Sequence, residues 1–516
     1  MDDDPARDPA ERGHDRRAFL MALGAGTAAV AGGLPLLSPA RAGRASRTSR
    51  LLRQLAGETR GRLTTRNDRG YRTVSQVFNT RFDGIRPLAV LRVADESDVV
   101  AAVKWAAANS IPIAARSGGH SYGGYSSVRN GLVVDLSALD HASVDVRQRT
   151  ARIGAGMQLI DFYAALARRG VTVPGGSCPT VGIAGLTLGG GVGMAARRWG
   201  TTSDNLLSLR VVTADGRVRT ADSRRNPDLY WASRGGGGGN FGIATSFRFR
   251  AHPVRAASYF FLDFPWSEAV AVVRRWQRWA PEAPPELYSI CAIETGADAP
   301  QVRVFGQWFG TEDALRRQLH GLTGEVRSTG VTIGTELYLD LMKRWAGCLG
   351  LSVAQCHLDG TTRRGTLPRD AFFAKSAYVQ RPMSDESARE MVRQIDLRQT
   401  QSAIGSGAFL LDSYGGALNE PSPTATAFVH RDNICSIQYF TQWTRPSSQR
   451  QSIAWLQGAY RATAPYVSRQ AYQNYIDPTL KDWQRAYYAQ NYRRLVAVKR
   501  RYDPDEVFRF AQGIPA

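Results

Sequence analysis

The sequence has 516 residues, of which 43% are hydrophobic and 22% are charged, enough for two or more domains with well-formed cores. The formal net charge is +21, but no long run of Lys or Arg and no zinc-finger spacing follows the first 50 residues. These features argue against nucleic acid as a partner and favour a solvated basic surface.

The first 42 residues are typical of an export signal. Residues 15–20 are Asp-Arg-Arg-Ala-Phe-Leu, a twin-arginine pattern, and an apolar run over 21–37 follows. Ala40-Arg41-Ala42 then matches a small-x-small cleavage site. Because glycines and Pro35 interrupt the apolar run, it is too weak for a stable membrane anchor. We therefore expect a twin-arginine signal peptide over 1–42 and an extracellular or cell-envelope location.

Strands and helices alternate from Pro87 to about residue 253. Asp95 begins a helix that ends near Asn109, and apolar residues at helical spacing predict a second helix over 158–169. Asp215-Gly216 between two apolar runs predicts a hairpin. The expected strands are 88–93, 111–116, 132–136, 144–153 as a continuation of the same sheet, 207–212, 217–220 and 244–249, with a short helix at 226–231.

Three glycine-rich loops lie within this region. Residues 174–193 contain eight glycines and Cys178, residues 116–124 contain His120, and residues 234–242 form the third loop. Because glycine is costly to order, such density indicates that the main chain approaches a bound group closely. Main-chain N–H groups freed in this way can point at phosphates. We therefore predict a phosphate-bearing cofactor, a flavin, that His120 and Cys178 both reach.

Other chemistries fit these loops less well. Gly191–Ala196 matches the G-x-G-x-x-A pattern of NAD sites, but glycines precede it instead of a strand, and no suitable acidic residue follows. No third or fourth ligand accompanies His120 and Cys178, so we expect no metal. A Cys–His hydrolase is conceivable, but it would not need so many glycines around its nucleophile.

The sequence pattern changes after His252-Pro253. Residues 257–460 mix alternating strands, such as 302–308 and 436–440, with polar helices at 312–322 and 384–396. We expect a separate antiparallel sheet with helices on one face, followed by a helical, aromatic segment over 461–516. Four tryptophans could stack on sugar faces, although a core position explains each more simply: Trp266, Trp308, Trp345 and Trp443.

The five cysteines are an odd number. In an exported protein two disulfides could form and leave one thiol, and Cys178 is the natural remainder because the cofactor loop would use it. Spacing does not decide how Cys291, Cys348, Cys356 and Cys435 pair.

Several motifs together resemble the berberine-bridge-enzyme-like branch of the vanillyl-alcohol-oxidase superfamily. They are Arg116–Tyr122, Cys178–Gly182 with Gly189–Gly191, Asp204-Asn205, Arg234–Gly242, and Tyr502-Asp503-Pro504 with Val507-Phe508. The resemblance implies an α+β fold: a two-domain PCMH-type FAD-binding fold plus a substrate domain whose antiparallel sheet is backed by helices. The FAD-binding domain would span 43–256 with its core at about 83–253, the substrate domain 257–460, and a segment returning to the FAD domain 461–516.

The same resemblance implies that His120 bonds the flavin 8α carbon and that Cys178 bonds flavin C6. Val181 matches a position where a small residue lets dioxygen reach the flavin, which implies an oxidase. The other residues implied to bind FAD are Arg116, Ser117, Gly118, Gly119, Ser121, Tyr122, Gly176, Thr180, Gly182, Gly185, Gly190, Gly191, Asp204, Gly242, Ile243 and Asn474.

A Tyr-x-Asn-Tyr motif is implied to supply the catalytic base. Either Tyr472 or Tyr475 would take a substrate hydroxyl proton near flavin N5, and a neighbour would have to lower its ordinary pKa of about 10. Gln438 matches a position that faces the flavin. Ser436 stands where the branch often has a basic residue, which puts stabilisation of a tyrosinate by a cation there in doubt.

The resemblance therefore predicts a FAD-dependent oxidase whose partners are a small-molecule substrate and O2. It would oxidise an alcohol group of a sugar, glycoside or secondary metabolite and reduce O2 to H2O2. The alternatives are oxidative cyclisation or dehydrogenation of an alkaloid or polyketide and, in another class, a basic binding protein without turnover.

Overall fold

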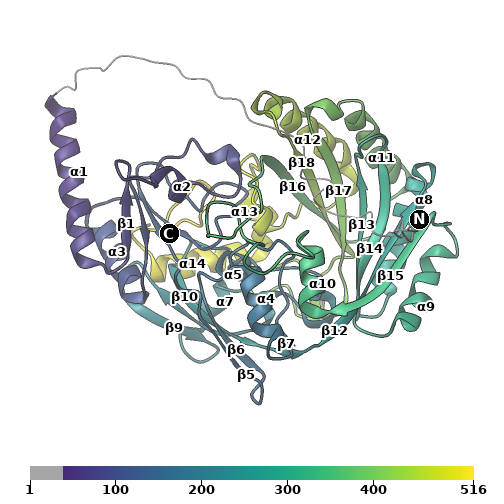
Figure 1. Cartoon of the computed structure of the whole chain (residues 1–516), viewed down its shortest axis with the longest axis horizontal. Helices are drawn as coiled ribbons and strands as arrows, with labels where there is room; N and C mark the ends of the chain where they lie inside the picture. The colour runs from purple at the N-terminus through teal and green to yellow at the C-terminus, as the bar shows by residue number, and fades with distance from the viewer. Residues whose placement is uncertain (1–38) are drawn as a thin grey trace, which may run out of the picture.

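The computed structural model describes residues 39–516, with side chains from residue 47 onward. The predicted signal peptide therefore lies outside the described residues, except for its last four positions, which begin helix α1 (Pro39–Glu58). The described chain forms two lobes, one built on two small sheets and the other on a seven-stranded sheet (Figure 1). No helix in residues 39–516 is long and apolar enough to cross a membrane.

The first sheet has the strand order β1-β2-β4-β3. β2 (Ala89–Arg92), β4 (Leu132–Asp135) and β3 (Ile113–Arg116) are parallel, and β1 (Arg62–Thr65) is antiparallel to β2. Helix α3 (Glu96–Ala108) connects β2 to β3, and its N-cap Asp95 accepts a hydrogen bond from the Ser97 N–H, as the sequence predicts. The chain leaves β3 at Arg116 and enters the loop that contains His120.

The second sheet is antiparallel, with the order β5-β6-β10-β8-β9. The single strand predicted at 144–153 is wrong: β5 (Ala142–Asp145) and β6 (Thr150–Gly154) form a hairpin in this second sheet. The chain turns because residues 146–149 are exposed and mostly polar. β8 (Leu206–Val212) and β9 (Val218–Asp222) form the hairpin predicted from Asp215-Gly216, and β10 (Ile243–Arg250) is the central strand.

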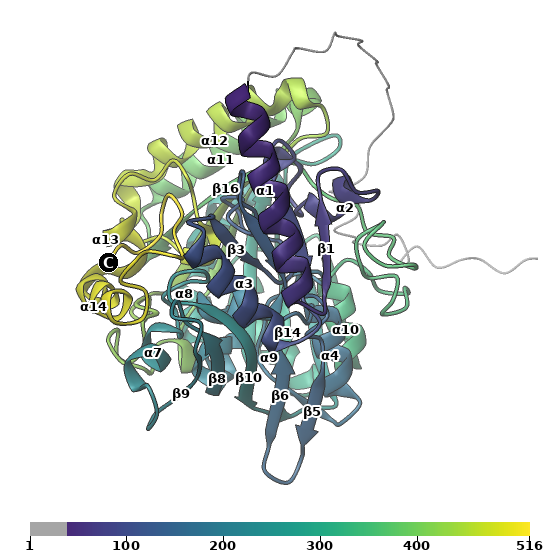
Figure 2. The same ribbon diagram turned by 90° about the vertical axis from the view of Figure 1, so that its left-hand side faces the viewer.

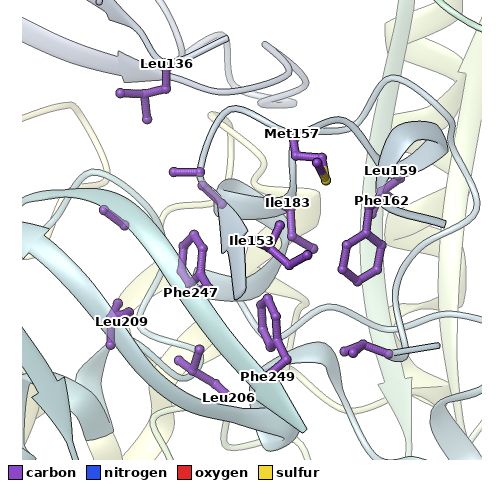
Figure 3. Packing of buried hydrophobic residues seen from close by; sticks show 14 of the residues in the cluster. Leu136, Ile153, Met157, Leu159, Phe162, Ile183, Leu206, Leu209, Phe247 and Phe249 are labelled. Carbon is purple, nitrogen blue, oxygen red and sulfur yellow. The ribbon is translucent and has the colours of Figure 1, made fainter. Parts of the chain in front are cut away.

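One hydrophobic cluster joins this sheet to helices α4 (Leu159–Ala167) and α5 (Ile183–Leu188). Figure 3 shows the packing of its large side chains around the sheet. Each such side chain stabilises the fold by about 1.5–3 kcal/mol when fully buried. Those at the centre are Ile153, Met157, Leu159, Phe162, Ile183, Phe247 and Phe249. The glycine stretch is therefore packed, as its aliphatic residues indicate, and it includes a short helix.

The seven-stranded sheet is antiparallel, as predicted for residues 257–460. Its strands in spatial order are β15 (Gly330–Leu337), β12 (Ala256–Phe264), β14 (Gln301–Trp308), β13 (Leu287–Glu294), β17 (Ser406–Ser413), β18 (Cys435–Gln442) and β16 (Phe372–Val379). Helices cover its outer face (Figure 1): α8 (Ala269–Glu282), α9 (Glu312–Thr323), α11 (Asp385–Gln399) and α12 (Gln449–Thr463). The inner face is turned toward the first lobe.

The C-terminal segment returns to the first lobe, where α14 (Tyr492–Tyr502) lies beside α7 (Pro227–Ala232) (Figure 2). Lys499 donates to the Asn240 carbonyl at 2.9 Å, and Tyr488 of α13 (Trp483–Tyr488) donates to the Gly236 carbonyl at 3.1 Å. The remaining elements are α2 (Tyr71–Ser75), α6 (Ala196–Trp199), α10 (Tyr338–Trp345), and the paired β7 (Val171–Thr172) and β11 (His252–Pro253).

The cysteines form one disulfide within the described chain, between Cys348 and Cys356, although their number would allow two. Cys291 and Cys435 are buried thiols on β13 and β18, and β17 lies between those strands. Because neighbouring strands lie about 4.8 Å apart, two strand spacings separate these residues by more than a disulfide spans.

Candidate functional site

The loop that carries His120 is anchored by Arg116, the last residue of β3. The Arg116 guanidinium donates to Asp135 on β4 at 2.6 Å and to the carbonyls of Val74 and Gln76. Its charge is therefore used inside the lobe, and Arg116 shapes the loop instead of reaching out of it. Ser117 Oγ likewise donates to the Ala155 carbonyl at 2.6 Å. The side chains of Arg116 and Ser117 are thus both engaged within the protein.

The His120 loop and the Cys178 loop touch each other. A methyl group added at Gly182 would lie 2.2 Å from the Gly118 nitrogen, so the two glycines allow the backbones to meet. One ring nitrogen of His120, Nε2, hydrogen-bonds Thr180 Oγ1 at 2.7 Å. Since Thr180 stands two residues after Cys178, this bond brings together the two predicted attachment residues. Cys178 is exposed, as an attachment point would have to be before a cofactor binds.

The surroundings of His120 keep its imidazole neutral. The ring is half-buried and stacks on Phe78, with ring centroids 4.0 Å apart. Burial lowers the pKa of His120 from 6.5 to about 3. A neutral imidazole has a lone pair on one nitrogen, so His120 is a nucleophile at neutral pH.

The long glycine stretch forms a cradle with the C-terminal motif. A methyl group at Gly189 would collide with the side-chain oxygens of Asn474 and Gln473, at 2.0 and 2.4 Å. A methyl group at Gly190, where φ is +112°, would lie 2.7 Å from Phe428. At Gly185, by contrast, no protein atom lies within 4 Å of the added carbon. The backbone is therefore packed tightly on one side and open beside α5.

A polar, planar cofactor fits this arrangement. The Gln473 Oε1 atom is buried and has no hydrogen-bond partner among the described residues, and it lies against Gly189, where a methyl group would not fit. Such an atom needs a donor that the protein part does not supply. The loops offer main-chain donors, a neutral imidazole and an exposed thiol. We conclude that these residues suit FAD. No cluster of potential metal ligands occurs within residues 39–516.

The NAD alternative fails on geometry. Gly191–Ala196 follows helix α5, and α6 after it has only four residues. A dinucleotide fingerprint needs a strand, a tight turn and a long helix whose N-terminus faces the pyrophosphate.

Several other residues predicted to bind FAD form contacts within the protein that hold the loops in place. Asp204 forms an ion pair with the buried Arg431 at 2.7 Å, and its carboxylate accepts the N–H of Thr201, the N-cap of the 3-10 turn, at 2.9 Å. Ser121 Oγ accepts the Tyr125 N–H at 3.1 Å, and the Gly176 carbonyl accepts from Tyr163. Gly242 lies against the Val212 carbonyl, where β10 begins at Ile243. For Asp204, Ser121 and Arg116, side-chain contact with a cofactor stays a prediction.

Tyr472 is buried, and its hydroxyl is held within the protein. The hydroxyl accepts hydrogen bonds from the Gly191 N–H and from Asn474 Nδ2, each at 3.0 Å. Asn474 Nδ2 also donates to the Leu186 carbonyl. Burial, countered in part by these donors, raises the pKa of Tyr472 to about 12. Tyr472 therefore fastens the C-terminal motif to the glycine stretch.

Tyr475 lies close to Tyr122, Gln438 and Cys178, which are all predicted site residues. Its ring stacks on Tyr122, with centroids 5.1 Å apart and planes 10° apart. The Tyr122 hydroxyl accepts a hydrogen bond from Gln438 Nε2 at 3.0 Å. Burial raises the pKa of Tyr475 well above 10, and Tyr122, Asp412 and the nearby Cys178 raise it further. Neither tyrosine therefore has the lowered pKa that a base acting near neutral pH would need.

Asp412 is a site residue that sequence reasoning missed. It is the register partner of Ser436 on β18, and it accepts a hydrogen bond from Tyr288 at 3.0 Å. The sheet thus places the carboxylate of Asp412 opposite Ser436, the position where a cation that stabilises a tyrosinate was in doubt. A single acid in the apolar run Ala408–Ser413 was the available signal, since such a residue needs a partner or a function.

Of the four tryptophans considered as sugar-stacking residues, three are buried in the core, which is the simpler of the two explanations given for them. Trp308, Trp345 and Trp443 are buried, while Trp266 is half-buried and donates to Asp396. Trp345 packs on Phe261 and Phe305.

Comparisons with known proteins agree with this geometry. Residues 87–222 match the family described as FAD binding domain, and residues 471–515 match the family described as berberine and berberine like. An uncharacterised FAD-linked oxidoreductase of Bacillus subtilis is 33% identical over 460 residues, 88% of this chain and 97% of that protein.

Solved structures show the same fold over nearly the whole described chain. BBE-like 1 of Physcomitrella patens superposes with a TM-score of 0.80 at 31% identity, over 90% of this chain and 99% of the other. A chitooligosaccharide oxidase superposes with a TM-score of 0.80 at 25% identity, over 91% and 99%. With its glycine cradle, its FAD-binding segment and its C-terminal motif, the chain belongs to the berberine-bridge-enzyme-like family of FAD-linked oxidoreductases.

Proposed function

We propose that this protein is an exported oxidase whose FAD is attached to both His120 and Cys178. It oxidises an alcohol group of a sugar, glycoside or secondary metabolite and reduces O2 to H2O2. The observation that carries the proposal is the His120–Thr180 hydrogen bond, which joins the two loops that hold the neutral imidazole and the exposed thiol. Bound FAD would supply the hydride acceptor and the reaction with O2.

Tyr475 is the tyrosine that meets the substrate. Both hydrogen bonds to the Tyr472 hydroxyl come from groups that fix the motif in place, so that oxygen is already engaged. Tyr475 instead stacks on Tyr122, beside Gln438 and near Cys178. We assign Tyr475 to the substrate hydroxyl and Tyr472 to positioning.

The proton that leaves the substrate is stabilised by Asp412. Because the pKa of Tyr475 is raised, the resting residue is a neutral phenol and not a tyrosinate. A neutral phenol can take the substrate proton only while its own proton passes to another base, and we assign that acceptor to the carboxylate of Asp412. Gln438, through Tyr122, holds the stacked pair in place. Tyr475 and Asp412 therefore act as one unit.

The experiment that tests the function is a screen of sugars, glycosides and alcohols for H2O2 release by the flavin-loaded protein. Val181, the small residue after the Cys178 turn, supports O2 as acceptor. Turnover with an artificial dye but none with O2 would make the protein a dehydrogenase. Silence with both acceptors across a wide panel, with FAD present, would favour a binding role.

A further inference from the structure

A disulfide-anchored segment, residues 348–369, runs between α10 and β16 and belongs to no part of the site described above. Its first end is tied to helix α4, because Cys348 and Cys356 pack on Ile160 in one buried cluster. The same helix holds the Cys178 loop: the N–H groups of Leu159 and Ile160 donate to the carbonyls of Val181 and Pro179, at 3.0 and 2.9 Å.

The other end of the segment is tied beside His120. The Arg369 guanidinium donates to the Val77 carbonyl, at 2.8 Å through Nε, and forms an ion pair with Asp83. Phe78, the residue after Val77, is the ring that stacks on His120. The segment therefore starts next to the Cys178 loop and ends next to the His120 loop, and Figure 2 shows the green loops of this region between α2 and α10.

A shallow surface cavity of about 420 Å³, open to solvent, lies where the segment meets α4. Arg363, Arg364 and His357 are the basic residues that line it, with Asp161, Val353, Ala354 and Thr362 as the other lining residues. The Asp161 carboxylate is engaged by His357 Nε2 at 3.3 Å, and His357 Nδ1 lies 3.1 Å from Gln158 Oε1.

The two arginines are available to a ligand. Arg363 and Arg364 are exposed, and neither forms an ion pair with any residue of the described chain. Asp161, which already contacts His357, is the acidic residue in the lining, whereas Arg363 and Arg364 contribute two positive charges. The cavity therefore carries excess positive charge. Guanidinium groups bind carboxylate and sulfate through paired hydrogen bonds, and they do so better than ammonium groups.

We propose that this cavity is a substrate subsite that binds the carboxylate or sulfate group of an acidic carbohydrate. Asp161 of α4 lines the cavity, and its neighbour Ile160 donates to the carbonyl of Pro179, the residue after Cys178. The α4 wall of the cavity is thus next to the Cys178 loop, which places the cavity beside the proposed site. This inference rests on the proposed function and adds the charge of the substrate to it.

The test compares the flavin-loaded wild-type protein with R363A/R364A. R316A/R317A is the matched control, because it removes two adjacent exposed arginines from α9 on the outer face of the large sheet. Binding of a uronic acid oligomer, a sulfated oligomer, a neutral oligomer and inorganic sulfate is measured by titration calorimetry at low and high salt. KM and kcat are measured for every ligand that is turned over.

We expect at least one acidic oligomer to bind R363A/R364A about tenfold more weakly than wild type, with KM raised and kcat unchanged. The effect should shrink at high salt, and the neutral oligomer and R316A/R317A should show no change. Equal binding of acidic oligomers by wild type and R363A/R364A, or no binding at all, would overturn the subsite. Inorganic sulfate that binds as tightly as the oligomers would overturn its carbohydrate part. Acidic binding without any turnover would leave the subsite standing and count against the oxidase function alone.

Discussion

The cofactor side and the substrate side of this protein are built in different ways. On the cofactor side, each of two loops is one continuous stretch of sequence. The loops meet through glycine backbones and the His120–Thr180 hydrogen bond. On the substrate side, Gln438 and Asp412 come from different strands of the large sheet. Gln438 bonds Tyr122, which stacks on Tyr475 of the C-terminal motif, and the charge of Asp412 acts on Tyr475. The first kind of site is specified by local sequence, whereas the second depends on strand register.

The two tyrosines of the C-terminal motif give the sharpest test of this contrast. If Tyr475 serves the substrate side and Tyr472 the cofactor side, Tyr475→Phe should slow anaerobic flavin reduction by about 10²- to 10⁴-fold, because the proton acceptor is lost. Tyr472→Phe should slow it by less than about tenfold and lower the FAD content instead, since the Gly191 N–H loses its acceptor. Stopped-flow absorbance measures the rate of flavin reduction in each variant, and the absorbance spectrum of the purified protein gives its FAD content. The assignment is wrong if Tyr472→Phe proves the slower variant.

Removal of the Asp412 charge should have the next largest effect. Asp412→Asn keeps an acceptor for Tyr288 but removes the negative charge that raises the pKa of Tyr475. We expect flavin reduction to fall by about 10- to 100-fold and its pH profile to shift toward lower pH. Asp263→Asn on β12, which breaks a surface pair with Arg303, is the control. An unchanged pH profile would show that Asp412 has only a packing role.

The cofactor side can be tested with a single methyl group. Gly185→Ala meets no protein atom within 4 Å, so the protein part should fold normally, but the methyl enters the open side of the cradle. We expect about tenfold less FAD to be incorporated, because the added methyl must be accommodated before the cofactor can be attached. Gly458→Ala in α12 also meets no atom and should only stabilise the fold, by about 0.5–1 kcal/mol. Full FAD content in both variants would show that the cofactor does not lie against α5.

Asp370, where the two lobes meet at the start of β16, predicts a smaller, pH-dependent effect on stability. Burial raises its pKa from 3.8 to about 6, and Gln442 donates to it at 3.0 Å. Because the folded pKa lies above the unfolded one, the folded state favours the protonated form, and stability is lost as the pH rises from about 4 through 6. Asp370→Asn should therefore raise the free energy of unfolding by about 1–3 kcal/mol at pH 8, and hence the unfolding temperature, and should leave both unchanged at pH 3.5. Thermal unfolding at both pH values checks the sign.

The same contrast explains how far the sequence could be interpreted. The glycine loops, the α3 cap and the hairpin at Asp215-Gly216 are local patterns, and the structure has each of them. Asp412 could not be placed, because its neighbours Ser436 and Tyr288 lie on other strands. The strand predicted over 144–153 is wrong because the alternation of polar and apolar residues continues through a polar turn. A count of cysteines could not show that β17 separates Cys291 from Cys435, which rules out the second possible disulfide.

The most direct measurement is the intact mass of the protein expressed with ample flavin, for wild type, His120→Ala, Cys178→Ala and the double variant. Double attachment predicts that wild type and both single variants carry one FAD after denaturation, whereas the double variant carries none. Peptide mapping of the wild type should then find one flavin shared by the peptides that contain His120 and Cys178. A wild-type protein of unmodified mass, or a double variant that still carries FAD, would contradict the account.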